Sequence, residues 1–355
     1  MNIFQMVPNL AFGDAVGNDI LAIDRLLRAQ GYHTKIMAKV VDPKLKSARA
    51  EIIKEVPRLN KNDILIHHLA NGDELLKQLP VCDAKIVFRF HNITPAEYYF
   101  PYDANVYSIC KKGREQLKEV NSLPDYCIAD SDYNKQDLVN LGYRCPIEVN
   151  PVLVPLEDYD KQPNKAVVEK YNDGWVNIIF VGRIAPNKKQ EDVIKTFSWY
   201  KKHLNNKSRL FLVGGDSTVK YTQRLKEYVE FLGSDDIYFT GKIPFVDILA
   251  YYRIASVFLC MSEHEGFCVP LVEAMKFHIP IVARSSSAIP YTLGNAGVII
   301  KDNNPVIASL AIERVLDDES FRNTIIKRQD ERLSYFSYDN VGSQFLRIID
   351  RIRLI

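Results

Sequence analysis

The chain has 355 residues, of which 47% are hydrophobic and 25% charged, and its formal net charge is +2. This length is greater than that of a usual single domain and predicts two domains. The small net charge argues against a dedicated nucleic-acid-binding protein. Six cysteines are scattered without a C-x-x-C pair, which favours reduced thiols over a disulfide framework or a zinc site.

The first residues, MNIFQMVPNLAFGD, have no basic region followed by an apolar core, so we expect no signal peptide. No uncharged apolar run approaches the roughly 18 residues that a membrane span needs. These features predict a cytoplasmic protein.

Short apolar runs alternate with amphipathic stretches along the chain. In the first half the expected strands are 2–7, 34–38, 63–68, 85–90 and 126–131. Between the first two, GNDILAIDRLLRAQG (17–31) has helical periodicity and ends at Gly31. In the second half the expected strands are 176–182, 208–215, 236–241, 256–261, 280–284 and 297–300. Strands that are apolar throughout and alternate with helices predict an α/β fold with parallel sheets covered on both faces.

The polar segment 155–175 contains prolines and has little periodicity, so we expect the linker between two domains there. The predicted domains are residues 1–160 and residues 161–337.

The run SEHEGFCVPLVEAMKFHIPIVAR (262–284) places two carboxylates where an apolar strand gives way to a helix. Pro270 suits the first turn of a helix, which puts Glu273 in the opening turn and Glu265 in the preceding loop. A continuous helix would separate the two acids by about 12 Å along its axis. The loop must therefore fold back if both acids contact one ligand, and the N–H groups at the helix start favour a phosphate. Taken alone, two such acids are more often merely solvated or capping residues.

Two further loops follow apolar strands. GRIAPNK (182–188) offers Arg183 and Lys188 beside Gly182, and two cations on such a loop suit a diphosphate, although basic loop residues are usually only solvated. In FGDAVGNDI (12–20), Gly13 and Gly17 depart from the G-x-G-x-x-G pattern, which argues against a simple NAD site.

Histidines stand near the ends of two expected strands. His91 ends the strand in FRFHNITPAEYY (88–99), a position more often structural than catalytic. His67 and His68 are adjacent, so their side chains should point to opposite faces of the sheet and not share a metal.

Several runs of the second half, in this order and spacing, resemble the GT-B retaining glycosyltransferases of glycosyltransferase family 4. Glu265 and Glu273 match the E-x7-E signature of that family. The similar runs are 180–197, 212–215, 239–259, 262–284 and 287–300. The first half is similar to that family only through the glycine-containing loop FGDAVGNDI (12–20) and the run FHNIT. The resemblance implies two Rossmann-like, doubly wound parallel-sheet domains facing across a cleft that closes on the donor, with the last helix, about 338–355, packing back on the first domain.

The resemblance also implies a donor site for a nucleotide-diphosphate sugar. Arg183 and Lys188 would hold the diphosphate, so that no metal or other cofactor is needed. Glu273 would bind the ribose hydroxyls, Glu265 those of the transferred sugar, and His91 would face that sugar. The expected catalytic residues are His91, Arg183, Lys188 and Glu265. The other expected donor-binding residues are Gly13, Gly182, Lys242, Ile243, Gly266, Phe267, Cys268, Val269 and Glu273.

Two positions depart from the family pattern. Lys189 follows the loop lysine where the family often has glycine, which predicts a different local backbone. Cys268 replaces the second glycine of EGFG, which predicts a more crowded sugar pocket.

The implied activity is hexose transfer, with retention, to a hydroxyl of a glycan or lipid-linked acceptor in surface polysaccharide or lipopolysaccharide biosynthesis. GDP-mannose is the favoured donor and a UDP-hexose the next. Segment 95–120 combines five aromatic residues with four basic ones. It is interpreted either as a solvated helix–loop–helix or as an acceptor platform with peripheral contact to the inner face of a membrane.

Two other functions stay open at this point. A GT-B-type nucleotide-sugar epimerase would need acid and base carboxylates at the sugar ring and would interconvert sugars without releasing nucleotide. A non-catalytic nucleotide-sugar binding module would release no nucleotide even with an acceptor present.

Overall fold

The computed structural model describes residues 1–48 and 50–355, and the chain divides into two compact units. Unit 1 comprises Met1–Glu97, Asn105–Pro155 and Phe336–Ile355, and unit 2 comprises Tyr98–Ala104 and Leu156–Tyr335. The chain therefore passes between the units close to the predicted boundary at 160/161, and the last helix belongs to unit 1.

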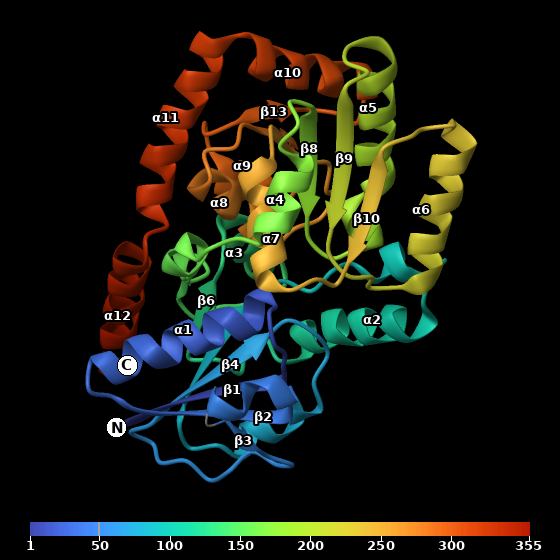
Figure 1. Ribbon diagram of the computed structural model, residues 1–355. Coiled ribbons are helices and arrows are strands. Elements are labelled where there is room, and N and C mark those ends of the chain that lie inside the picture. Colours follow the sequence, from blue (N-terminus) through green and yellow to red (C-terminus); the bar gives the residue numbers. More distant parts are fainter. Residues whose placement is uncertain (49) are drawn as a thin grey trace. The chain divides into compact units, whose positions relative to one another are not determined.

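Unit 1 contains a seven-stranded sheet in the order β3-β2-β1-β4-β5-β6-β7, with all neighbours parallel (Figure 1). The strands are β1 Asn2–Leu10, β2 His33–Val41, β3 Glu51–Ile52, β4 Ile64–Leu69, β5 Lys85–Phe90, β6 Tyr126–Ala129 and β7 Ile147–Val149. The sequence patterns missed β3 and β7. Both are short edge strands without a fully buried residue, so they have no apolar run to detect.

The helices that accompany this sheet are α1 Ala15–Ala29, η1 Pro43–Ala48, η2 Glu74–Val81, η3 Ala96–Tyr99, α2 Ala104–Glu119, α3 Asp132–Asn140 and α12 Tyr338–Leu354. Helix α1 begins two residues before the expected start because Asp14 caps it, accepting a hydrogen bond from the Gly17 N–H at 2.6 Å. It ends just before Gly31, whose φ of +79° stops the helix.

Apolar side chains fill both faces of this sheet. On one face, residues of α1 and α12 such as Leu27 and Phe345 pack on the strands. On the other face, Leu75, Leu117 and Leu138 come from η2, α2 and α3. Burial on both faces explains why the strands are apolar throughout.

Unit 2 contains a second parallel sheet of six strands in the order β10-β9-β8-β11-β12-β13. The strands are β8 Val176–Val181, β9 Ser208–Val213, β10 Ile237–Gly241, β11 Val257–Cys260, β12 Ile281–Arg284 and β13 Val298–Ile300. Its helices are η4 Leu156–Asp160, α4 Lys165–Tyr171, η5 Pro186–Lys188, α5 Gln190–His203, α6 Val219–Leu232, α7 Phe245–Ile254, α8 Val269–Lys276, α9 Ile289–Leu293, α10 Pro305–Asp317 and α11 Glu319–Tyr335.

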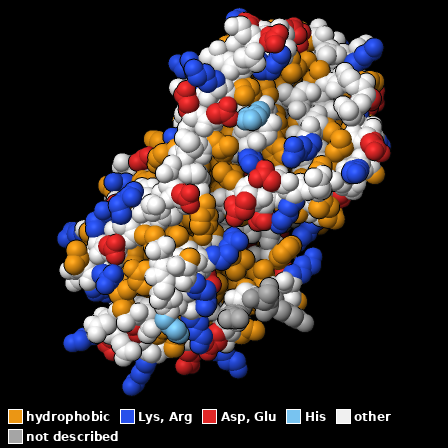
Figure 2. Space-filling model, turned by 60° about the vertical axis from the view of Figure 1, so that its left-hand side comes forward, with side chains coloured by type: hydrophobic (Ala, Val, Ile, Leu, Met, Phe, Trp, Pro, Cys, Tyr) orange, Lys and Arg blue, Asp and Glu red, His pale blue; other side chains and the backbone are white. Residues whose placement is uncertain are grey.

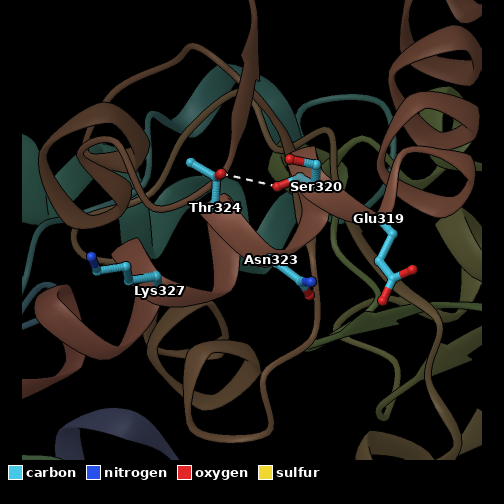
Figure 3. A pocket seen from close by; sticks show the side chains of 5 residues that line it. All are labelled: Glu319, Ser320, Asn323, Thr324 and Lys327. Atoms are coloured by element: carbon cyan, nitrogen blue, oxygen red, sulfur yellow. Dashed lines mark hydrogen bonds between the residues drawn. The ribbon is translucent and has the colours of Figure 1, made fainter.

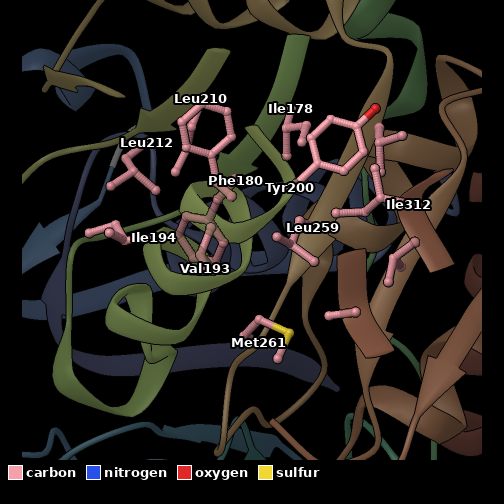
Figure 4. Close-up of a cluster of buried hydrophobic side chains, with 14 of the residues drawn as sticks. Ile178, Phe180, Val193, Ile194, Tyr200, Leu210, Leu212, Leu259, Met261 and Ile312 are labelled. Carbon is pink, nitrogen blue, oxygen red and sulfur yellow. The ribbon is translucent and has the colours of Figure 1, made fainter. Parts of the chain in front are cut away.

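Successive residues of β8 face opposite layers of unit 2. Ile178 and Phe180 join the cluster drawn in Figure 4, which is closed by α5 and α10, whereas Ile179 and Val181 join the cluster under α7 and α8. This alternation has the strand period of two, with an apolar layer on each side. Both sheets therefore have the predicted α/β architecture.

The segment expected to be a linker is folded. It contains η4 and α4, and Asn164 holds it to α7: its N–H donates to the Val246 carbonyl at 3.0 Å and its side-chain amide to Asp247 Oδ1 at 2.7 Å. Sequence patterns missed this because η4 and α4, with five and seven residues, are too short to show a helical period.

Basic and acidic side chains are interspersed on the face shown in Figure 2, without a field of one sign. Within residues 1–48 and 50–355, no helix combines the length and the apolar character needed to cross a bilayer.

Candidate functional site

In unit 2, β8 and β11 are parallel neighbours, so the loops that follow them lie at the same edge of the sheet. Asn187 joins these two loops. Its carbonyl accepts from the N–H groups of Glu263 and His264 at 2.9 and 3.3 Å, and its side-chain amide donates to the His264 carbonyl at 2.9 Å. The structure thus brings together the basic loop and the acidic loop that the sequence singled out. Asn187 itself was not predicted, since its role depends on the pairing of two distant strands.

Across this junction the Lys188 ammonium group donates to Glu265 Oε2. The side chains are 18% and 7% exposed, so the pair is largely shielded from water. Burial lowers the pKa of Lys188, but the adjacent Glu265 carboxylate outweighs burial and the pKa is raised overall. The ion pair therefore orients both side chains.

Arg183 lies at the start of the same loop with an exposed side chain. Within the described part of the chain, its guanidinium takes part in no ion pair. An unneutralised guanidinium beside a buried Lys–Glu pair makes this edge of the sheet suitable for an anion.

Glycines allow the backbone to approach closely here. Gly214, which follows β9, has a φ of +148°, and a side chain there would lie 2.1 Å from the Gly182 carbonyl oxygen. The close approach of these two backbone segments therefore requires glycine at position 214. In the sequence analysis Gly214 appeared only as part of the run LVGG.

The two departures from the family pattern share one backbone feature. Lys189 has a φ of +51° and Cys268 a φ of +73°, so both residues lie in the left-handed region that glycine prefers. At Lys189 a residue with a side chain thus adopts a conformation that suits glycine, and the expected difference from the family's backbone stays a prediction. Ion pairs with Glu191 and Glu263 hold the Lys189 side chain.

The loop before α8 is fixed by residues from α9 and the turn before it. The Glu265 N–H donates to Ser287 Oγ at 2.8 Å, and Thr292 Oγ1 donates to the Phe267 carbonyl at 2.5 Å. Phe267 and Cys268 are buried, whereas Gly266 and Val269 are half-buried. The predicted lining of the sugar site is thus a rigid turn, and its ligand role stays a prediction.

Two of the expected donor-binding residues, Lys242 and Ile243, follow β10. Lys242 is exposed and Ile243 half-buried, the latter packed on the cluster under α7 and α8. Lys242 lies beside Gly215, where an added Cβ would be 3.2 Å from the Lys242 Cβ. Both positions are thus at the carboxyl ends of the strands, as the other donor-site residues are.

Glu273 is the fifth residue of α8, so its predicted position in the opening helical turn is wrong and it lies one turn later. Its two carboxylate oxygens each accept a hydrogen bond from a tyrosine hydroxyl, Oε1 from Tyr159 of η4 and Oε2 from Tyr252 of α7. Burial raises the pKa of Glu273, although both hydroxyls act to lower it. A carboxylate has about four acceptor sites, so two remain for a ligand.

In unit 1, Gly13 lies in the loop after β1 with a φ of +77° and open space around its α-carbon. Gly17 is the crowded glycine of this turn, because a Cβ there would be 2.3 Å from the Ala11 carbonyl oxygen. The first loop can therefore present its backbone at Gly13, as predicted for an approach to phosphate, and that role stays a prediction.

His91 follows β5, and both nitrogens of its ring are bonded inside unit 1. Nδ1 is 2.8 Å from Asp130 Oδ2 and Nε2 is 2.9 Å from Nδ1 of His68. Its expected role facing the donor sugar stays a prediction, and in this arrangement no ring nitrogen is left for a ligand.

The hydrogen-bond pattern assigns the protons of this network. Gln5 donates from Nε2 to the Ile20 carbonyl, so its Oε1 accepts from Nε2 of His68 at 3.1 Å. Burial lowers the pKa of His68 well below its usual value, so His68 is neutral and its Nδ1 is an acceptor. His91 therefore donates from Nε2 to His68, and its Nδ1 is bonded to the Asp130 side chain.

His67 belongs to a different environment. Its ring packs edge-on against Phe88, and burial lowers its pKa to about 3. The ring of His68 instead lies edge to edge with that of His91, with the ring planes 8° apart and the centroids 5.2 Å apart. The adjacent pair thus has separate partners, as their alternation along the strand predicts.

Two groups of described side chains have the composition and spacing of metal ligands: Asp19, His68 and His91, and Cys260, Glu265 and Cys268. The ligand atoms of the first already have protein partners, because Asp19 forms a fully buried ion pair with Arg89 and both ring nitrogens of His91 are bonded within unit 1. The second borders the predicted donor site and is considered below.

A hollow on α11, drawn in Figure 3, is lined by Glu319, Ser320, Asn323, Thr324 and Lys327. Thr324 Oγ1 donates to the Ser320 carbonyl at 2.9 Å, which is an ordinary intrahelical bond. None of the predicted site residues lines this hollow, and it offers no convergent polar groups.

Comparison with known proteins agrees with the geometry at the strand ends. The family profile of glycosyl transferases group 1 matches residues 160–332. The O-antigen chain mannosyltransferase B of Escherichia coli is 24% identical over 274 residues, which are 73% of this chain and 68% of that protein. Other curated relatives are matched over about half of their own length.

Solved structures share the fold over almost the whole chain. Sucrose-phosphate synthase of Thermosynechococcus elongatus is 15% identical with a TM-score of 0.78, covering 99% of both chains. Anabaena HepE, crystallised with UDP and glucose, is 15% identical with a TM-score of 0.77, also covering 99% of both chains. Residues 160–332 thus match the glycosyl transferases group 1 family, and the chain is a glycosyltransferase with the GT-B fold.

Proposed function

We propose that the chain transfers a hexose, with retention, from a nucleotide-diphosphate sugar to a hydroxyl of a glycan or lipid-linked acceptor. The observation that carries this proposal is the group at the carboxyl ends of β8 and β11, where the unneutralised Arg183 lies beside the buried pair of Lys188 and Glu265. Such a group matches a ligand that combines a diphosphate with a polyol.

Each side chain has a distinct role in this proposal. Arg183 and Lys188 bind the diphosphate and offset the charge that develops on it as the sugar leaves. Glu265 accepts hydrogen bonds from hydroxyls of the sugar, and Glu273 accepts them from the ribose. Because two cations already balance the diphosphate, we propose that transfer needs no metal ion.

The reaction breaks the bond between the anomeric carbon and the phosphate oxygen, and the acceptor oxygen bonds to the same face of the sugar. The acceptor proton passes to the leaving phosphate, so neither Glu265 nor Glu273 has to act as a nucleophile. Preorganised charge from Arg183 and Lys188 is then the main contribution of the protein to catalysis.

GDP-mannose is our first choice of donor, supported by the similarity to an O-antigen mannosyltransferase. A UDP-hexose is the second, because Anabaena HepE of the same fold binds UDP and glucose. The same relative supports an acceptor in lipopolysaccharide or related surface-polysaccharide assembly. We propose action in the cytoplasm at the inner face of the membrane, where the exposed Phe100 and the basic residues of α2 suit peripheral contact.

A thermal-shift panel of GDP, UDP, ADP, dTDP and CDP on wild type and Glu273→Ala tests the proposal. A ligand at about 100 times its dissociation constant stabilises the native state by about 2.7 kcal/mol. Stabilisation by one nucleotide that is lost in the variant identifies the base and supports the ribose role of Glu273. Absence of any shift in the wild type would contradict the proposed donor site.

A further inference from the structure

Two thiols meet beside the proposed sugar-binding carboxylate. Cys260 ends β11, Cys268 caps the start of α8, and Glu265 lies in the loop between them. One ligand atom from each of the three residues lies within 4.8 Å of the other two. All three side chains are nearly inaccessible, since the residues are 1%, 7% and 7% exposed.

The backbone conformation at Cys268 indicates that the thiol does more than fill space in the core. Its φ of +73° lies in the left-handed region, where a residue with a Cβ costs about 1 kcal/mol relative to glycine. The retained side chain points its sulfur toward Cys260.

The chemistry of these three groups fits a soft divalent cation. Two thiolates and one carboxylate are ligands that Zn²⁺ accepts in tetrahedral sites, and sulfur atoms bound to one Zn²⁺ lie about 3.8 Å apart. The three ligand atoms thus need only a small adjustment to surround an ion. One coordination position remains open to water.

We propose that Cys260, Cys268 and Glu265 form a binding site for a thiophilic divalent cation such as Zn²⁺. On binding, two metal–sulfur bonds and one metal–oxygen bond form, and the two thiol protons leave to solvent without any change of oxidation state. The ion brings two positive charges and the departing protons remove two. The net charge buried beside Lys188 therefore stays the same, which avoids the usual cost of burying an ion.

Occupation of this site changes the loop that the donor uses. A cation on Glu265 competes with the Lys188 ammonium group for the same carboxylate. It also occupies the turn at Cys268, whose N–H lies in the proposed sugar pocket. The cation is therefore an inhibitor that competes with the donor, a consequence that rests on the proposed function, whereas metal binding itself does not.

The chain contains a matched control. In unit 1, the sulfurs of Cys145 and Cys127 are 3.5 Å apart, so this pair is similarly close. Among the described groups that could hold a metal, however, neither of these two cysteines appears with a third ligand. A site that needs only two neighbouring thiols would form at both pairs, and a site that needs the carboxylate would form only at Cys260 and Cys268.

The experiment titrates Cd²⁺ into the reduced, metal-free full chain and follows the ultraviolet absorption of cadmium–thiolate bonds. We expect one saturable equivalent per chain with release of two protons, measured in weak buffer. The signal should be lost in Cys260→Ser and in Cys268→Gly, and kept in the double variant Cys127→Ser/Cys145→Ser. Cys268→Gly also relieves the left-handed backbone, so its loss of signal does not reflect unfolding.

A second measurement separates this site from the proposed function. Zn²⁺ at saturation should raise the apparent dissociation constant of the nucleotide-diphosphate sugar at least tenfold in wild type and not in Cys268→Gly. A saturable signal that survives in Cys268→Gly, or that disappears in the control double variant, would overturn the metal site. Cd²⁺ binding without any nucleotide binding would instead leave the site standing and contradict the proposed function.

Discussion

Lys188 and Glu265, 77 positions apart in the chain, form an ion pair that joins the loop after β8 to the loop after β11. Its partners come from adjacent parallel strands, and both are mostly shielded from water. The pair thus holds in place the two loops to which we assign diphosphate and sugar binding.

Removal of one partner of this pair should be costly. Lys188→Met leaves the Glu265 carboxylate buried without its partner, and we expect a loss of about 3 kcal/mol in the free energy of unfolding. The double variant Lys188→Met/Glu265→Gln should lose much less, because no charge then remains buried. Trp175 and Trp199, the two tryptophans of the chain, both belong to unit 2, so urea unfolding followed by their fluorescence reports on this unit. Equal losses in the single and double variants would contradict the pair's role.

The same pair predicts a dependence on alkaline pH. The pKa of Lys188 is raised above 10.5 in the folded state, so the folded protein holds this proton more tightly than the unfolded chain. Its contribution to stability is fully present below about pH 10.5 and declines as the pH rises through the folded pKa. The difference in unfolding free energy between wild type and Lys188→Met should therefore shrink above about pH 10.5. A difference that stays constant through this range would contradict the assignment.

Replacement of Glu273 should raise the stability of the protein but weaken its binding of nucleotide. Burial raises the pKa of Glu273, so the folded protein binds this proton more tightly than the unfolded chain, and stability falls as the pH rises above 4.5, the usual pKa of a glutamate. Glu273→Gln removes the buried charge and should make the protein free of ligand more stable at pH 7. It should also abolish stabilisation by the preferred nucleoside diphosphate.

Urea unfolding at pH 4 and pH 7 checks this prediction, because the gain from Glu273→Gln must be larger at pH 7. Tyr252→Phe is the matched control, since it removes a hydroxyl that donates to Glu273 and keeps the ring that stacks on Phe277. It should destabilise the wild type by about 2 kcal/mol, as expected for a hydrogen bond to a charged group. The same change in the Glu273→Gln background should cost less.

The sequence predicted the residues at the strand ends better than the residues that support them. Arg183, Lys188 and Glu265 stand in loops that directly follow apolar strands, so local patterns place them at one edge of a parallel sheet. Tyr159 and Tyr252 lie 114 and 21 positions from Glu273, and nothing in their neighbourhoods indicates a carboxylate partner. Contacts of this kind depend on tertiary packing, which periodicity does not encode.

The secondary structure likewise divides into elements that local sequence patterns predicted and elements that they did not. Strands with two buried faces were predicted from their apolar runs, whereas the edge strand β3 and the short helix α4 were not. Similarly, His91 was recognised as a strand-end residue, but its bonds to Asp130 and His68 follow from the order of β4, β5 and β6 in the sheet.

Lys189 provides a direct test of the left-handed backbone in the basic loop. At a φ of +51°, glycine should be more stable than alanine by about 1 kcal/mol, because only alanine has a Cβ to strain. We therefore expect Lys189→Gly to unfold at higher urea than Lys189→Ala. Both variants lose the same partly exposed ion pairs, so their difference isolates the backbone. Equal stability would show that the loop relaxes out of this conformation.

The tautomer of His68 is testable by nuclear magnetic resonance. At pH 7 its buried, neutral ring should have one proton, on Nε2, because Gln5 Oε1 can only accept. Spectra of protein labelled with ¹⁵N in histidine identify this tautomer by the shifts of the ring nitrogens. His68→Phe identifies the signals of His68 and removes the acceptor of His91 Nε2, so that nitrogen should shift while Nδ1 of His91, bonded to Asp130, changes little. A proton on Nδ1 of His68 in the wild type would contradict the assignment.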